Sequence, residues 1–154
     1  MRVSVDSSFV YAMLKNELPA VERSRAQATL MEADVVHVAM LVLEELFRFS
    51  PADSLPGNES RLARYAALQQ FLLTVEARPI TQPLAYELAQ LWRVAHDNGA
   101  TSTTIDAFAA REAVHAQCTM LTCDDNMRRY MARGFGESSV VYFQNAEVSV
   151  PTSP

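Results

Sequence analysis

The stretch "VSVDSSFVYAML", residues 3–14, decides the fold. Its first half alternates like a short buried strand, predicted over residues 2–6, and its second half predicts a helix over residues 8–15. Asp6 stands at the junction and has two interpretations. It is a local cap for the orphan N–H groups of the helix, or it belongs to a site built with partners elsewhere in the chain. We expect the second role to outweigh the first.

The alternation of strand and helix continues along the chain. Further strands are predicted at residues 35–38, 119–122 and 140–143, and helices at residues 19–31, 40–49, 58–74, 82–96, 105–117 and 127–133. Two prolines and a glycine predict a loop over residues 50–60, and a short extended segment covers residues 78–80. This order favours right-handed βαβ units. The expected fold is a three-layer α/β/α sandwich around a mostly parallel sheet.

Length and composition favour a single domain. Of the 154 residues, 49% are apolar, enough to bury a core, so we expect one domain over residues 1–147 and a disordered tail over residues 148–154. No segment has the character of a membrane span or a secretion signal, which favours a cytoplasmic location. Cys118 and Cys123 lie on opposite faces of a predicted strand, so they cannot easily form a disulfide.

The charge pattern limits the partners. A net charge of −5 argues against a protein that coats nucleic acid through bulk positive charge, although a local basic track remains compatible with it. Twelve of the thirteen cationic side chains are arginines, which suit bidentate phosphate contact. Arg128 and Arg129 follow the last acidic position closely, so they are either phosphate contacts or part of a solvated helix face.

Several acids fall near one predicted edge of the sheet. The carboxyl ends of parallel strands share an edge, and Asp6, Asp106 and Asp124 all fall there, joined by Glu44 or Glu45. Asp6, Asp106 and Asp124 alone have local explanations as cap, first-turn and turn residues, and surface pairing with Arg48 would explain one of the two glutamates but hardly both. Together they would repel one another unless a cation compensated them. Oxygen ligands without histidine or thiolate suit Mg²⁺ or Mn²⁺.

These residues resemble those of PIN-domain proteins, especially VapC-type toxins. "VSVDSSFVYAML" is similar to the family's opening block, in which an Asp followed by Ser or Thr ends the first strand. "VAMLVLEEL" resembles the second block, whose acid directly precedes a leucine, and this selects Glu45 over Glu44. "DAFAAREAVHAQCTMLTCDDN" is similar to the third block, in which Asp106 and Asp124 stand eighteen residues apart and Thr122 supplies a hydroxyl.

The resemblance implies a metal-dependent endoribonuclease that uses Mg²⁺ or Mn²⁺ and leaves a 5′-phosphate and a 3′-hydroxyl. Asp6, Asp106 and Asp124 would hold the metal, and Glu45 would complete the catalytic set. The remaining candidate site residues are Ser7, Thr122 and Asp125 as supports of the ligands, and Arg128 and Arg129 as RNA contacts. The resemblance further implies an RNA substrate, a homodimer and a small antitoxin protein as partner.

Two departures from the family pattern keep an alternative open. Asn126 stands where the family often has a second acid, although the adjacent Asp125 is able to substitute, and the glycine usual before the third strand is absent. A non-catalytic PIN-like module that binds RNA or protein in a regulatory role fits these departures. No glycine-rich phosphate loop follows any predicted strand, which argues against a nucleotide-dependent α/β enzyme.

Overall fold

The computed structural model describes residues 1–47, 59–102 and 104–145. Most of the loop predicted over residues 50–60, and the tail predicted over residues 148–154, lie outside these ranges. The loop prediction is wrong at its last two residues, because a helix begins at Glu59. Among the described residues, no helix combines the length and the apolar character needed to cross a bilayer.

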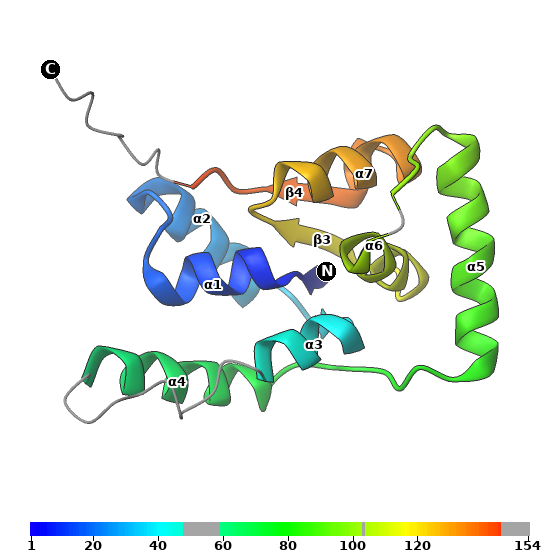
Figure 1. The fold of residues 1–154 in the computed structure, drawn as a ribbon. Coiled ribbons are helices and arrows are strands. Elements are labelled where there is room, and N and C mark those ends of the chain that lie inside the picture. The colour runs from blue at the N-terminus through cyan, green and yellow to red at the C-terminus, as the bar shows by residue number, and fades with distance from the viewer. Residues whose placement is uncertain (48–58, 103, 146–154) are drawn as a thin grey trace, which may run out of the picture.

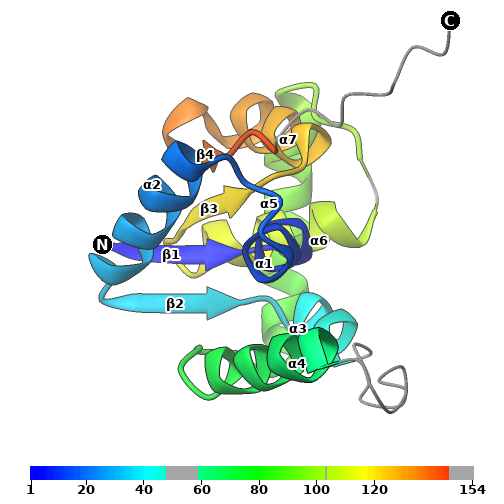
Figure 2. The same cartoon turned by 90° about the vertical axis from the view of Figure 1, so that its left-hand side faces the viewer.

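Four parallel strands form a single sheet in the order β2-β1-β3-β4. They are β1 (Arg2–Val5), β2 (Val35–Val38), β3 (Thr119–Thr122) and β4 (Val140–Tyr142). The arrowheads of β1, β2 and β3 point the same way in Figure 2, and β4 pairs with β3 in parallel, so the carboxyl ends of the strands share one edge. The prediction of a mostly parallel sheet is confirmed.

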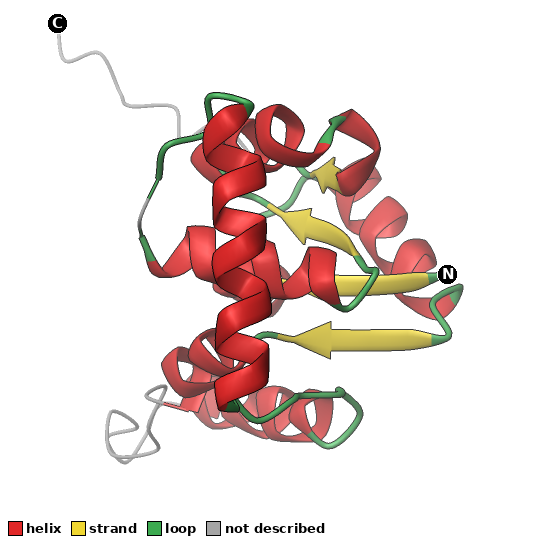
Figure 3. Ribbon diagram, turned by 90° about the vertical axis from the view of Figure 1, so that its right-hand side faces the viewer, coloured by secondary structure: helices red, strands yellow, loops and turns green. Residues whose placement is uncertain are grey.

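Seven α-helices and one short 3₁₀ helix surround the sheet in the described residues. They are α1 (Ser7–Lys15), α2 (Ala20–Met31), α3 (Met40–Phe47), α4 (Glu59–Leu72), α5 (Gln82–Asp97), α6 (Ile105–His115), α7 (Asp125–Phe135) and the 3₁₀ helix η2 (Glu137–Ser139). Figure 1 shows α1 and α2 on one face of the sheet and α5 and α6 on the other, and Figure 3 shows α5 as the outermost helix of that second face. The expected three-layer α/β/α sandwich is confirmed.

Some local predictions need correction. The helix predicted from residue 19 begins at Ala20, because Pro19 is the N-cap of α2. The helix predicted from residue 105 does begin there, and Ile105 is 59% exposed at this open edge of the fold. The extended segment expected at residues 78–80 has no strand pairing within the described residues, and an isolated parallel bridge joins Glu76, just before it, to His37. Helix α7 begins at Asp125, two residues before the predicted start at residue 127. Its first turn is polar, so the apolar pattern used for the prediction did not include it.

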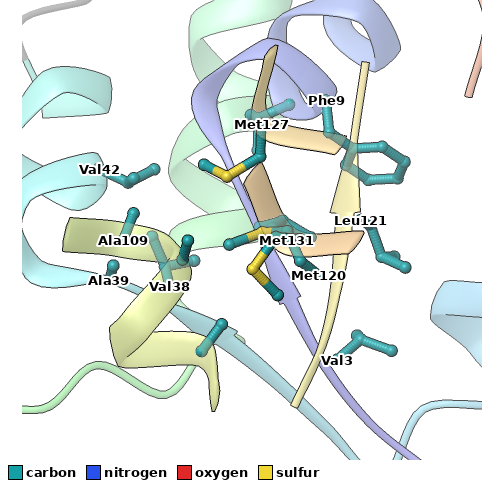
Figure 4. Close-up of a cluster of buried hydrophobic side chains, with 14 of the residues drawn as sticks. Val3, Phe9, Val38, Ala39, Val42, Ala109, Met120, Leu121, Met127 and Met131 are labelled. Carbon is teal, nitrogen blue, oxygen red and sulfur yellow. The ribbon is translucent and has the colours of Figure 1, made fainter. Parts of the chain in front are cut away.

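The core lies on both faces of the two central strands (Figure 4). Val3 and Leu121 are fully buried from β1 and β3, and Met131 of α7 is fully buried as well. On the α1 face, the rings of Phe9 and Phe143 pack with their centroids 5.2 Å apart. Each such side chain contributes roughly 1.5–3 kcal/mol on burial. This packing fixes where α1, α6 and α7 begin relative to the sheet edge.

A polar cluster interrupts the core between β1, β2 and α6. Ser4, His37 and Glu112 are each 0% exposed. Ser4 and His37 are register partners on adjacent strands, and Ser4 Oγ lies 3.3 Å from His37 Nδ1. His37 Nε2 lies 3.5 Å from Glu112 Oε1, at ion-pair distance although outside hydrogen-bond geometry. These contacts connect three of the elements that lead into the acidic edge.

Candidate active site

Asp6 is a buried carboxylate held by three donors. It is 4% exposed and is the N-cap of α1. Its Oδ1 accepts hydrogen bonds from Phe9 N at 2.9 Å and Ser8 Oγ at 2.8 Å, and its Oδ2 accepts one from Thr122 Oγ1 at 2.5 Å. The expectation that capping matters little for Asp6 is therefore wrong. The same carboxylate begins the helix and faces the end of β3.

The protonation equilibrium of Asp6 is strongly shifted. Burial raises the pKa of Asp6 from 3.8 to about 6, although the hydrogen bonds from Thr122, Phe9 and Ser8 lower it. The negative charge of Asp124 raises it further. Near neutral pH, Asp6 therefore holds a charge that its surroundings oppose, a condition common at functional sites.

Asp124 lies two residues after the end of β3 and caps α7. Its Oδ1 accepts a 2.7 Å hydrogen bond from Asn126 N, and its own N–H donates to Thr122 Oγ1 at 2.9 Å. Thr122 thus contacts both aspartates: it donates to Asp6 and accepts from the backbone of Asp124. The capping role explains why an acid occurs here, and the position after a central strand explains why it meets Asp6.

Ser8, which the sequence analysis missed, completes this arrangement. Its hydroxyl donates to Asp6, accepts from Cys123 N at 3.0 Å and lies 3.3 Å from Thr122 Oγ1. Ser7 was predicted for this role, but the hydroxyl that contacts Asp6 belongs to Ser8. The available signal was its spacing: a short polar side chain two residues after a cap is able to bond back to it.

Asp106 and Glu45 form the other end of the acidic edge. Asp106 lies in the first turn of α6, which Thr104 caps through Ala107 N at 3.3 Å. Partial burial, Asp124 and Glu45 raise the pKa of Asp106, in that order. Asp106 and Glu45 also line one cavity of about 540 Å³ between α3 and α6. Its described lining is Leu41, Glu44, Glu45, Thr104, Ile105 and Asp106.

The four carboxylates thus interact electrostatically as a series of pairs: Asp6 with Asp124, Asp124 with Asp106, and Asp106 with Glu45. Each coupling raises the pKa of an acid, and no cationic side chain is among the causes that shift Asp6 or Asp106. Such an all-oxygen set suits Mg²⁺ or Mn²⁺. In the described part of the chain, no three metal-ligating side chains lie close enough together to hold an ion as they stand. The donor chemistry fits a divalent cation, and the acids influence one another electrostatically.

Asp125 has a different environment. Its carboxylate forms ion pairs with Arg128, at 2.7 Å, and with Arg129. These two arginines lower the pKa of Asp125, first through the hydrogen bond from Arg128. The side chains of Arg128 and Arg129 are 37% and 65% exposed, so both remain accessible while one carboxylate holds them. Asp125 therefore pairs with the predicted RNA contacts.

A second cavity lies on the other side of Asp106. It measures about 330 Å³ and lies between α6 and α7; its described lining is Ser102, Thr104, Asp106, Ala107, Asn126, Met127 and Tyr130. Asn126, noted in the sequence only as a departure from the family pattern, is exposed here. Asp106 and Thr104 line both cavities, so the candidate site opens to both sides of the α6 N-terminus.

Comparison with known families identifies this arrangement. The PIN domain model matches residues 3–132, from β1 into α7. The chain belongs to the PIN domain family. The resemblance stated from the sequence is confirmed, and the acidic edge lies within the matched part of this PIN domain. No curated protein matches the chain.

Solved structures show the same fold. VapBC2 from Rickettsia felis, bound to a DNA fragment from its promoter, is similar with a TM-score of 0.63 and 16% identity, covering 94% of this chain and 100% of that one. VapBC-1 from nontypeable Haemophilus influenzae has a TM-score of 0.59 and 12% identity, covering 94% and 98%. FitAcB from Neisseria gonorrhoeae has a TM-score of 0.59 and 18% identity, covering 94% and 97%. At these identities the likeness concerns the fold alone.

Proposed function

We propose that this PIN domain is a metal-dependent endoribonuclease. The observation that carries the proposal is the electrostatic coupling of four carboxylates at the carboxyl edge of a parallel sheet, in which Asp124 raises the pKa of both Asp6 and Asp106, and Glu45 raises that of Asp106. Carboxylates crowded in this way favour a divalent cation. Membership of a family of nucleases supports the same reaction class.

Each acid has a proposed role. Asp6, Asp106 and Asp124 would hold Mg²⁺ or Mn²⁺, which when bound lowers the pKa of a water and stabilises charge on the phosphate. Glu45, half-buried across the cavity from Asp106, orients the attacking water. Thr122 and Ser8 fix the rotamer of Asp6 through their hydroxyls. The products are a 5′-phosphate and a 3′-hydroxyl.

Cleavage of a fluorescent single-stranded RNA tests this proposal. We expect cleavage with Mg²⁺ or Mn²⁺, none with a chelator, and a loss of at least 100-fold in Asp6→Asn and Asp124→Asn. Asp34→Asn is the matched control, because Asp34 pairs with the N-terminal ammonium at the opposite end of β1. Equal activity in Asp6→Asn and Asp34→Asn would refute the assignment.

We further propose that the nuclease is the toxin of a toxin–antitoxin pair and acts in the cytoplasm. Similar folds come from VapBC and FitAB assemblies, which supports a small antitoxin partner for this chain. A homodimer is proposed from the family resemblance alone. Growth arrest on expression, relieved by a neighbouring small gene, would support this role. A monomeric mass in solution would refute the dimer.

A non-catalytic binding module is the alternative. One observation favours it: among the described residues, no three metal-ligating side chains lie close enough together to hold an ion. Calorimetry with Mn²⁺ separates the two functions. Binding that Asp124→Asn abolishes supports the nuclease, and absence of binding by a well-folded protein supports the module.

A further inference from the structure

The cavity between α6 and α7 has the features of a nucleoside subsite. Helices α6 and α7 lie side by side (Figures 1 and 2), and the cavity between their first turns measures about 330 Å³. That volume lies at the lower end of the range for small-molecule sites. Asp106 lines it, so anything bound there is adjacent to the proposed reaction centre.

The lining divides into an apolar floor and a polar rim. Ala107, Met127 and Tyr130 are 1%, 1% and 7% exposed, and they form the buried floor. Thr104 and Asn126 are exposed at the rim. An apolar floor accepts the face of a base, and hydroxyl and amide groups hydrogen-bond to its edge and to the ribose.

The floor is supported by a buried arginine. Arg111 is 9% exposed, and its Nη1 donates to Tyr130 Oη at 3.2 Å, so the phenolic hydrogen is not used in that bond. The Nε of Arg111 has no hydrogen-bond partner, and in the described residues no carboxylate pairs with it. A buried guanidinium that meets no carboxylate among the described side chains favours an electron-rich ligand beside Tyr130.

The two cavities beside Asp106 differ in charge. The cavity on the α3 side is lined by Glu44 and Glu45, which disfavour an RNA backbone without metal. The described lining of the cavity on the α7 side has one acid, Asp106, and the neutral amide of Asn126 in place of the family's second acid. An asparagine amide carries one donor face and one acceptor face, the pattern that pairs with the edge of adenine.

We propose that this cavity binds the base and ribose of the nucleotide next to the cleaved phosphate, with Asn126 reading the base edge and the Arg111–Tyr130 pair holding the floor. This subsite rests on the proposed nuclease function for its biological use, but its binding chemistry does not require turnover. It makes Asn126 a specificity-determining residue of this chain.

Nucleotide binding without metal tests the subsite separately from catalysis. The full chain is titrated with AMP, GMP, CMP, UMP and ribose 5-phosphate in the presence of a chelator, and amide chemical shifts are followed. We expect at least one nucleotide to bind at least fivefold more tightly than ribose 5-phosphate. Of the four nucleotides, AMP should bind most tightly. The shifts should be largest in the first turns of α6 and α7. Equal binding of all five probes, or shifts centred elsewhere, would overturn the proposal.

Variants sharpen the test. Asn126→Ala should remove the preference between bases, and Tyr130→Phe should weaken binding of every nucleotide severalfold. Gln27→Ala removes an exposed amide on α2, away from the cavity, and should change neither. Retention of base preference in Asn126→Ala would contradict the assigned role.

The cleavage pattern supplies a second readout. On a randomised RNA pool, the wild type should favour one base at a single position beside the cut, and Asn126→Ala should flatten that preference. If the chain binds nucleotides in the cavity but cleaves no RNA, the nuclease proposal fails and the subsite stands. If it cleaves RNA without base preference and binds no nucleotide, the subsite fails and the nuclease stands.

Discussion

Thr122 Oγ1 donates a 2.5 Å hydrogen bond to Asp6 Oδ2 across 116 residues of sequence. The last residue of β3 thus fixes the carboxylate that follows β1. Because both groups are buried, the bond to this acceptor is a charge-assisted interaction shielded from water once Asp6 ionises. The geometry of the candidate site therefore depends on the pairing of the two central strands.

Replacing Thr122 should show how much this bond contributes. Thr122→Val removes the hydroxyl at nearly constant volume, and we expect it to lower the free energy of unfolding at pH 8 by about 1.5–3 kcal/mol. It should also raise the pKa of Asp6, since the hydrogen bond lowers it. Urea unfolding measures the first effect. Thr122→Ser keeps the hydroxyl and should cost less; an equal loss in both variants would assign the effect to packing.

The raised pKa of Asp6 makes stability depend on pH. Because the folded pKa of about 6 exceeds the ordinary 3.8, the folded state binds the proton more tightly, and this contribution is present below pH 4 and lost as pH rises through 6. Asp6→Asn lacks the titration. Its stability relative to wild type should therefore increase by about 2.4 kcal/mol between pH 4 and pH 7. A difference that is constant over this range would contradict the shift.

The buried contact between His37 and Glu112 predicts that their contributions to the free energy of unfolding are strongly coupled. His37→Leu leaves the Glu112 carboxylate in the core without its partner, and we expect a loss of about 3–5 kcal/mol in the free energy of unfolding. The double variant His37→Leu/Glu112→Leu should recover most of that loss, because the buried carboxyl group left without its partner is then gone as well. Urea unfolding of the full mutant cycle measures the coupling. Additive single effects would show that the pair does not interact.

Asp125 is expected to lower the affinity of the protein for RNA. Its ion pairs hold Arg128 and Arg129, so Asp125→Asn should free both and increase affinity for single-stranded RNA about threefold or more at low salt. Charge reversal of both arginines should weaken binding and reduce the salt slope by about 0.7 for each lost phosphate contact. Fluorescence anisotropy with a chelator present measures both. Charge reversal at the exposed Arg93 of α5 is the control, and an equal effect there would indicate net charge alone.

The sequence predicted most of the architecture because its strands are short apolar runs bounded by polar residues. The prediction matched β2 and β3 to the residue. It missed the start of α7, where the side chain of Asp124 accepts a hydrogen bond from Asn126 N, a polar contact that an apolar period does not register.

The site was predictable only in part. The positions of Asp6 and Asp124 after parallel strands indicate that they share an edge, because sheet geometry converts order along the chain into proximity. The role of Ser8, and the capture of Arg128 and Arg129 by Asp125, depend on rotamers and on the helix packing around them. Those contacts follow from the tertiary fold and carry no periodic signal in the sequence.

The two helix caps at the sheet edge have an evolutionary consequence. Asparagine caps a helix about as well as aspartate does, so a single change at Asp6 or Asp124 would remove the charge while the first turns of α1 and α7 stay in place. A descendant of this chain could therefore lose catalytic activity through one substitution and keep its fold. This is one route by which an enzyme lineage gives rise to inactive homologues.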